Sequence, residues 1–263
     1  MRDCANDPLL GMADVIKDAI RTVFESAGFR ITRLRPANRF QAMEEALGLL
    51  KGYGYDPRVI IDGGANVGTW TRMAHELFPL AHIHMVEPQP ACQGKLQLLC
   101  ETMPSVELHP VALTEPGVQR VRMAGGGEVG GGTGAWIARP DEHTAGEIMV
   151  PAATLDELFS SRITIDDRAL LKLDLEHSEI PALNGAPALL EKIEVILTEV
   201  QFFAVNNNGR EVFGDVLDYL RERGFDLYDI ACLSQRPRDF RLRMGDVIFV
   251  RRGSQLLEDT GWE

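Results

Sequence analysis

The sequence predicts an α/β fold with a mostly parallel sheet, and three observations carry this prediction. From Arg58 onwards, short apolar runs alternate with segments in which apolar residues recur every three or four positions. Such runs are typical of buried strands, and the periodic segments are typical of amphipathic helices. A glycine-rich turn follows the first run, and no helix separates the last two runs. Together these features indicate a parallel sheet covered on both faces, with an antiparallel hairpin at one edge.

Seven apolar runs are the expected strands, with helices between them. The strands are predicted at residues 59–62, 83–87, 106–109, 170–174, 195–200, 226–230 and 246–250. The helix after the first strand presents Trp70, Met73, Ala74 and Leu77 on one face. Two further amphipathic helices, at residues 12–27 and 37–51, precede the first strand. They form either a cap over a substrate entrance or a cover for the sheet edge.

Composition and charge argue against several classes of partner. The 263 residues carry a formal net charge of −12, which disfavours a broad binding surface for nucleic acid. The apolar runs fall well short of the roughly 20 residues that span a bilayer, and the first residues lack the apolar core of a signal peptide. The four cysteines, at positions 4, 92, 100 and 232, have neither CxxC nor metal-ligand spacing. We therefore expect a reduced, cytoplasmic protein without nucleic-acid or membrane partners.

The most informative stretch is the glycine-rich turn at residues 62–68, DGGANVG. Glycines at such a turn allow the backbone to approach a nucleotide-type ligand closely. A dinucleotide site has glycines at offsets zero, two and five, but counting from Gly63 places Ala65 at the middle position. Asp62 comes directly before the first glycine of this stretch. Its carboxylate would repel a pyrophosphate, and it suits the cationic sulfonium and amino groups of S-adenosylmethionine. The turn therefore favours S-adenosylmethionine as cofactor and argues against a dehydrogenase.

A second carboxylate lies at the end of the next strand. Glu87, followed by Pro88, is placed where a carboxylate accepts hydrogen bonds from both ribose hydroxyls of a nucleoside. The alternative is that Asp62 and Glu87 only cap neighbouring helices. As a pair at two strand ends, they favour a cofactor site.

A third group of polar residues follows the strand at residues 170–174. This strand delivers Asp174 to its carboxyl end, where ligands bind in open α/β sheets, and Glu176 and His177 follow. Methyl transfer to an alcohol requires the acceptor oxygen to lose a proton. A histidine near carboxylates suits this task, so His177 is the candidate general base. The alternative for His177 is a local hydrogen bond at a helix N-terminus.

Glu199 lies at the end of the next predicted strand, residues 195–200. The candidate catalytic residues are therefore Asp174, Glu176, His177 and Glu199. Adjacent strand-end carboxylates such as Asp174 and Glu199 can share a divalent cation with a substrate hydroxyl. The alternative is a direct hydrogen bond between Glu199 and the acceptor, and we assign no metal.

Two further segments have either a functional role or only an ordinary surface structure. The glycine-rich stretch at residues 125–134 is either a mobile lid or a surface hairpin turn. The basic segment at residues 236–243 either binds an anionic acceptor or carrier, or forms a solvated hairpin face.

Several stretches together resemble the FkbM family of S-adenosylmethionine-dependent methyltransferases. They are residues 59–68, 86–90, 110–113, 150–158, 171–176 with 183–186, and 196–199, in the family's order between about residues 45 and 250. The resemblance implies a Rossmann-like, seven-stranded class I methyltransferase sheet. It also implies O-methylation of a hydroxyl on a sugar, polyketide or other secondary metabolite.

The resemblance also implies roles for individual residues. Asp62, Gly64 and Gly68 would line the methionine part of the donor, Glu87 would hold the ribose, and Val111 and Ala112 would face the adenine. Gly63, Asn66, Pro88 and Asp174 complete the expected donor-binding set. The family usually has glycine after its D-x-E triplet, whereas this chain has His177.

We thus predict an N-terminal helical extension at residues 1–56, a methyltransferase domain at 57–253 and a tail at 254–263. The predicted activity is O-methylation of a small-molecule hydroxyl. An N-methyltransferase, or a donor-binding protein without catalysis, is the alternative.

Overall fold

The computed structural model describes residues 38–125, 134–139, 142, 146–204, 210–259 and 261. Within the compact unit that begins at Asn38, the helix expected near residues 37–51 is observed as α2, Arg39–Gly52. The helix predicted at residues 12–27 and most of the glycine-rich stretch lie outside the described residues.

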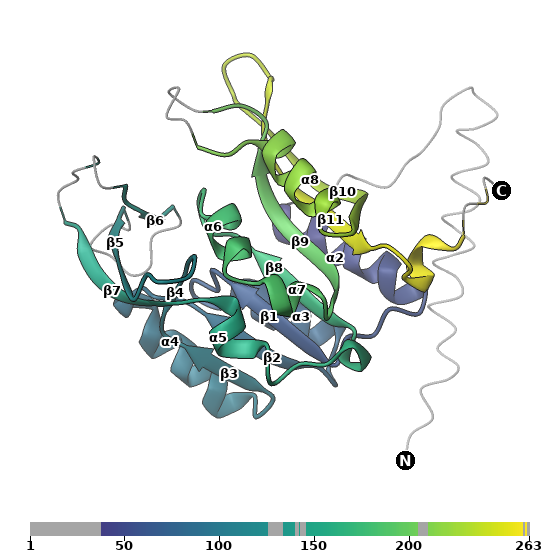
Figure 1. The fold of residues 1–263 in the computed structure, drawn as a ribbon, viewed down its shortest axis with the longest axis horizontal. Helices are drawn as coiled ribbons and strands as arrows, with labels where there is room; N and C mark the ends of the chain where they lie inside the picture. The colour runs from purple at the N-terminus through teal and green to yellow at the C-terminus, as the bar shows by residue number, and fades with distance from the viewer. Residues whose placement is uncertain are drawn as a thin grey trace, which may run out of the picture. The chain divides into compact units, whose positions relative to one another are not determined.

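A seven-stranded sheet forms the centre of this unit (Figure 1). Its strand order is β10-β11-β9-β8-β1-β2-β3. The strands are β1 (Val59–Gly63), β2 (His82–Val86), β3 (Val106–His109), β8 (Ala169–Leu173), β9 (Ile193–Gln201), β10 (Phe225–Gln235) and β11 (Leu242–Arg251). Neighbours from β3 to β9 pair in parallel, while β11 is antiparallel to both β9 and β10. The predicted mostly parallel sheet with an antiparallel edge hairpin is confirmed.

Helices cover both faces of this sheet, as continuously apolar strands require. On one face lie α2, α3 (Thr69–Leu77) and α4 (Pro90–Thr102), whose buried residues share one hydrophobic cluster with the strands. On the other face lie α5 (Leu155–Phe159), α6 (Glu179–Asn184), α7 (Pro187–Leu190) and α8 (Phe213–Glu222), which contribute to a second cluster. In Figure 1 the second group lies in front of the sheet and α2 and α3 lie behind it.

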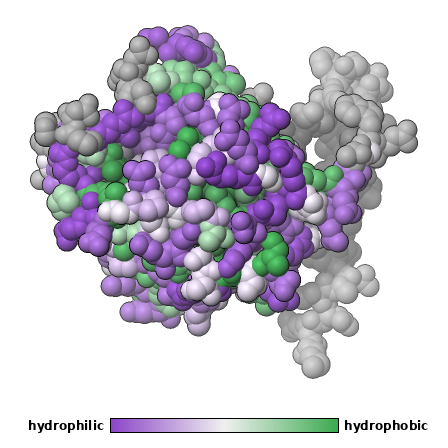
Figure 2. Space-filling model, viewed as in Figure 1, coloured by the Kyte–Doolittle hydropathy of each residue, from purple (hydrophilic) through white to green (hydrophobic). Residues whose placement is uncertain are grey.

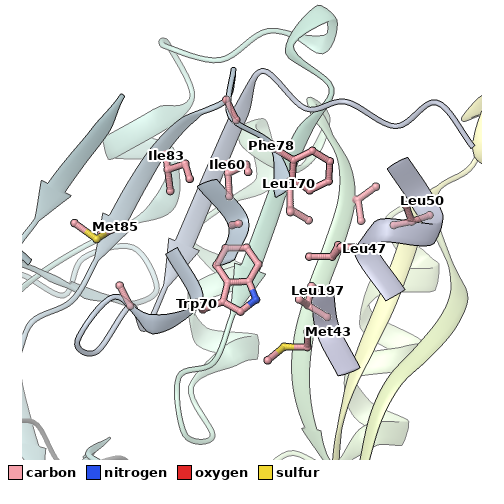
Figure 3. Close-up of a cluster of buried hydrophobic side chains, with 14 of the residues drawn as sticks. Met43, Leu47, Leu50, Ile60, Trp70, Phe78, Ile83, Met85, Leu170 and Leu197 are labelled. Carbon is pink, nitrogen blue, oxygen red and sulfur yellow. The ribbon is translucent and has the colours of Figure 1, made fainter. Parts of the chain in front are cut away.

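The helix α2 is part of the first hydrophobic cluster. Its N-terminus is capped by Asn38, whose side chain accepts a hydrogen bond from the Gln41 amide, 3.0 Å away. Met43, Leu47 and Leu50 follow at helical spacing and are buried. Figure 3 shows these side chains pointing towards strand residues of the sheet. Burying this stripe therefore fixes α2 against the sheet.

A small second sheet, which the sequence analysis did not predict, lies beside the main one. Its order is β4-β7-β5-β6, formed by β4 (Ala112–Leu113), β5 (Arg120–Ala124), β6 (Trp136–Ile137) and β7 (Ile148–Ala153). Two of these strands have only two residues, which is too short for an alternating pattern to be recognised. A buried cluster that includes Val121 and Val150 lies on this sheet.

The register of the central strands brings distant parts of the chain to one edge. Gly63, at the end of β1, pairs with Val86 of β2 and Leu173 of β8. The glycine-rich turn, Glu87 and Asp174 are the segments that directly follow these three strand ends. Parallel strands therefore place the predicted donor residues together.

In the part of the chain that the structure describes, no helix has the length and apolar character to cross a membrane. Hydrophilic residues cover most of the molecular face in Figure 2, with hydrophobic residues scattered between them.

Replacing Leu47 by alanine should lower the free energy of unfolding by about 2–5 kcal/mol, because the fully buried side chain would leave a cavity between α2 and the sheet. Urea unfolding measures the change. The matched control is Leu49→Ala on the same helix, where the side chain is 60% exposed; we expect a change of no more than about 0.5 kcal/mol. Equal effects of the two substitutions would contradict this packing of α2.

Candidate functional site

A cavity of about 280 Å³ lies at the carboxyl ends of β1, β2 and β8. Seven of the predicted donor-site residues line it: Gly64, Asn66, Glu87, Pro88, Val111, Ala112 and Asp174. Glu176, from the predicted catalytic set, lines it as well. Asp62, Gly63 and Gly68 lie behind or beside this surface and do not line it. The fold thus brings most of the predicted donor residues to one cavity.

Close packing explains two glycines of the turn. Gly64 has a φ of 77°, and a Cβ there would lie 2.0 Å from the backbone oxygen of Asp174. Gly68 has a φ of 78°, and a Cβ there would lie 2.2 Å from Leu99 of α4. Both positions combine a left-handed backbone with close contact, which only glycine accommodates without strain. These glycines therefore pack the turn against β8 and the start of α3 against α4.

Glu87 both lines the cavity and holds the turn. Its Oε2 accepts a hydrogen bond from the Asn66 amide at 2.8 Å, and its Oε1 accepts one from the Gln89 amide at 2.9 Å. Burial raises the pKa of the Glu87 carboxyl above its usual value, while these two hydrogen bonds act in the opposite direction. The Gln89 side chain also hydrogen-bonds to this carboxyl, and a carboxylate with about four acceptor positions keeps room for a ligand beside these three bonds.

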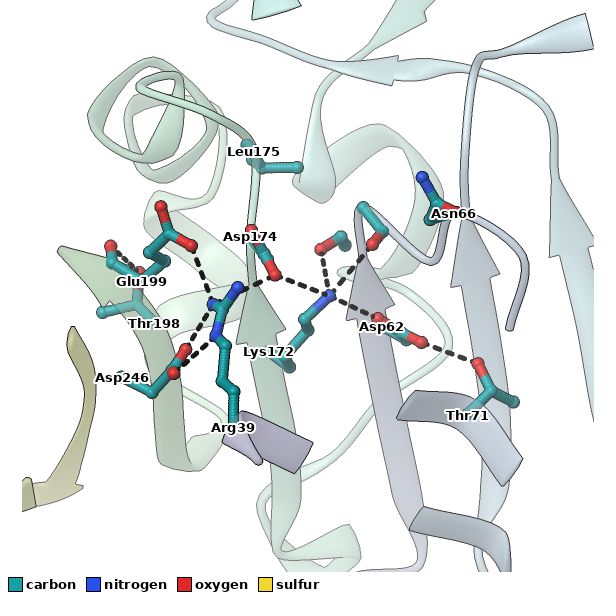
Figure 4. A network of polar contacts seen from close by, with 12 residues as sticks. Arg39, Asp62, Asn66, Thr71, Lys172, Asp174, Leu175, Thr198, Glu199 and Asp246 are labelled. Atoms are coloured by element: carbon teal, nitrogen blue, oxygen red, sulfur yellow. Dashed lines mark hydrogen bonds and ion pairs between the residues drawn. The ribbon is translucent and has the colours of Figure 1, made fainter. Parts of the chain in front are cut away.

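Lys172 on β8 supports the turn from beneath (Figure 4). Its Nζ lies 2.9 Å from Asp62 Oδ1 and donates to the carbonyl oxygens of Gly63 and Gly64 at 3.2 and 3.0 Å. Asp62 Oδ2 accepts a hydrogen bond from Thr71 on α3 at 2.6 Å. Burial alone lowers the pKa of Lys172, but its carboxylate neighbours, Asp62 foremost, outweigh this and raise it. Lys172 is therefore a buried cation that joins β8, β1 and the turn.

Arg39, the first residue of α2, lies between three carboxylates (Figure 4). Its Nη2 is 3.1 Å from Asp174 Oδ2 and 2.8 Å from Glu199 Oε2. Its Nε and Nη2 contact the two oxygens of Asp246 at 2.6 and 2.5 Å. Asp246 and Glu199 are direct cross-strand partners, an arrangement of like charges that is unfavourable without a cation. The guanidinium thus stands between Asp174 and Glu199, the pair considered as cation ligands.

Glu199 is a buried carboxyl that does not line the cavity. Burial raises its pKa to about 9, and the neighbouring Asp174 also raises it. Gln201 donates a hydrogen bond to Glu199 Oε1 at 3.0 Å. Burial and Asp174 therefore oppose the ionised form of Glu199, whereas the adjacent Arg39 favours it.

His177 lines a second cavity, of about 640 Å³. Ser178 and Ile137 line both cavities, so the two adjoin. His177 has a φ of 73°, in the left-handed region that favours glycine, the residue that the resemblance leads us to expect at this position. Burial lowers the pKa of His177 below its usual value, and the nearby Arg210 lowers it further. The imidazole is accordingly neutral at pH 7.

A model of the methyltransferase FkbM domain matches residues 62–227, which is more than half of the chain. The chain belongs to the FkbM methyltransferase family. The family model describes the matched segment as a methyltransferase domain. A search of curated proteins finds none that matches the sequence.

Three solved structures illustrate the similarity. Methyltransferase FkbM from Methylobacillus flagellatus KT is 16% identical with a TM-score of 0.45, over 73% of this chain and 44% of that one. The 1,6-didemethyltoxoflavin-N1-methyltransferase from Burkholderia thailandensis is 13% identical with a TM-score of 0.44, over 95% and 93%. An O-methyltransferase family protein from Burkholderia thailandensis is 11% identical with a TM-score of 0.44, over 80% and 55%. The chain spans less than half the length of the first of these proteins.

Three charged residues of this site, Arg39, Lys172 and Asp246, were not predicted from the sequence. Lys172 did leave a signal, because it is the one charged residue in the apolar run at residues 169–173, and a buried lysine requires an anionic partner. Arg39 left no local signal. Its partner Asp246 lies 207 positions away in the sequence.

Replacing Lys172 by methionine should lower the free energy of unfolding by about 3–5 kcal/mol, because Asp62 would remain buried without its cation. Adding Asp62→Asn should restore part of this loss by removing the unpaired charge. Denaturant unfolding of the wild type, the two single variants and the double variant measures the coupling. Additive losses in the double variant would contradict the pairing.

Proposed function

We propose that the protein is an O-methyltransferase that transfers the methyl group of S-adenosylmethionine to a hydroxyl of a small molecule, such as a sugar, a polyketide or another secondary metabolite. The observation that carries this proposal is the pairing of two adjoining cavities. One is lined by carboxylates at the strand ends, and the other is lined by a neutral histidine.

The first cavity suits the donor by its chemistry. Glu87, Asp174 and Glu176 line it together with Arg39 and Lys172, and its acidic side chains attract the donor's cationic groups. Val111 and Leu113 offer an apolar surface suited to the adenine ring. When bound, S-adenosylmethionine supplies a methyl group on a positively charged sulfur.

Glu87 is proposed to hold the donor's ribose, because its carboxylate lines the cavity and keeps acceptor capacity beside its hydrogen bonds to Asn66 and Gln89. Gly64 and Asn66 line the cavity beside it and are proposed to contact the donor directly. For Asp62 we propose an indirect role, since its carboxylate is engaged by Lys172 and Thr71. Through Lys172 it holds the carbonyl groups of the turn in place.

The second cavity is the proposed acceptor site, with His177 as the general base. A neutral imidazole accepts the proton of the acceptor hydroxyl at a ring nitrogen. Ser178, which lines both cavities, marks where donor and acceptor would meet. Asp174, held by Arg39, is proposed to organise the donor side, and Glu199 to support Arg39 from the protein interior.

Donor binding tests the proposed cofactor site. Isothermal titration calorimetry should detect S-adenosylmethionine binding to the wild type and none to Glu87→Ala, because this variant loses the ribose acceptor and the hydrogen bond to the turn. Glu101→Ala, an exposed carboxylate on the neighbouring helix α4, should bind as the wild type does. Binding of NAD in place of S-adenosylmethionine would contradict the proposal.

The role of His177 is best tested with glycine, which suits the left-handed backbone at this position. His177→Gly should lower kcat/KM for a hydroxyl acceptor by about a hundredfold or more while leaving donor affinity unchanged. The wild-type rate should fall as the pH drops through the pKa of His177, which lies below 6.5, because protonation removes the base. The variant should lose this acidic limb of the pH profile. Full activity with an unchanged profile would rule out His177 as the base.

A further inference from the structure

We propose that the outer strands β2 and β3 carry a binding site for a divalent transition metal ion such as Zn²⁺, formed by His82, His84 and Glu107, with His109 beside them as a hydrogen-bond partner of His84. None of these side chains lines either cavity. The proposal is therefore independent of the methyl-transfer site.

Strand geometry brings the four side chains to one place. Residues two positions apart in a strand point to the same face, which groups His82 with His84 on β2, and Glu107 with His109 on β3. The parallel register sets His84 directly opposite Glu107. Among the described residues, His82, His84 and Glu107 are the one group of three potential ligands whose binding atoms all lie within 4.8 Å of one another.

The distances from Glu107 Oε2 to the nitrogens of His82 and His84 are close to those around a tetrahedral ion. Glu107 Oε2 is 3.4 Å from His84 Nδ1 and 3.7 Å from His82 Nε2. His109 Nε2 is 3.1 Å from His84 Nδ1 and 3.7 Å from Glu107 Oε1. Two ligand atoms on a tetrahedral Zn²⁺, each bonded at about 2.0–2.2 Å, are separated by about 3.3–3.6 Å. Small side-chain movements would therefore suffice to coordinate one ion.

The surroundings resemble those of a metal site. Arg162 contacts both oxygens of Glu107, with Nη1 3.4 Å from Oε1 and Nη2 2.9 Å from Oε2, so an ion would share this carboxylate with the guanidinium. The Phe159 ring packs against His84 and His109, with ring centroids 5.0 and 5.1 Å apart, and limits the movement of both imidazoles. The side chains of His82 and Glu107 are 45% and 40% exposed, so an ion can reach the site from solvent.

The ligand types select the class of metal. Imidazole nitrogens favour Zn²⁺, Co²⁺ and Ni²⁺, whereas Mg²⁺ and Ca²⁺ prefer oxygen ligands throughout. An ion bound here would cross-link β2 to β3, the edge strand of the main sheet. Because it would bind the folded chain, it would stabilise the fold.

The test uses the full chain without an affinity tag, stripped of metal with a chelator. Calorimetry should show one Zn²⁺ bound per chain, and Zn²⁺ at a hundred times its Kd should raise the Tm by about 5–10 °C. Co²⁺ should give visible absorption bands on binding, and Mg²⁺ should leave the Tm unchanged.

Matched histidine variants locate the site. His82→Gln removes a half-exposed ligand and should weaken Zn²⁺ binding by at least about tenfold. His75→Gln, on α3 outside the group, should bind Zn²⁺ as the wild type does. His84 is buried, so His84→Gln can lower the stability of the protein by itself. The readout for this variant is therefore the difference between its Tm with and without Zn²⁺. We expect this difference to be zero. Absent Zn²⁺ binding, or equal binding by His82→Gln and the wild type, would overturn the proposal.

Discussion

The buried ion pair between Lys172 and Asp62 is the interaction on which the rest of the site depends. Both side chains are almost entirely removed from water, so their charges are stable only because each is paired and fully hydrogen-bonded. Lys172 also donates to the carbonyl groups of Gly63 and Gly64, and Asp62 accepts from Thr71. One interaction thereby joins β8, β1, the glycine-rich turn and α3 at the edge of the donor cavity.

The charged network extends from this pair to α2. Asp174 lies 3.9 Å from Lys172 and 3.1 Å from Arg39, and Arg39 also contacts Glu199 and Asp246. Two cations thus face four carboxyl groups, and burial raises the pKa of one of these, Glu199, which favours its neutral form. The consequence for function is that Asp174, which lines the cavity, is oriented by a residue from outside the sheet.

Sequence patterns predicted the main sheet well because its strands are continuously apolar and separated by periodic helices. The same patterns missed the second sheet, whose shortest strands, Ala112–Leu113 and Trp136–Ile137, are too short to show any period. At the site, Glu87 and Asp174 were predictable as strand-end carboxylates. Asp62 was equally recognisable, but its strand-end position did not reveal that Lys172 engages its carboxylate beneath the turn.

The sequence by itself determined the order of strands and helices, the glycine-rich turn and the acids that follow the strands, because periodicity and turn chemistry act between neighbouring residues. Only the tertiary structure decided which partners those acids meet. Asp62 pairs with Lys172 across 110 positions, and Arg39 pairs with Asp246 across 207. Such contacts depend on which strands lie side by side in the sheet and on how α2 packs against it, and no local pattern encodes either.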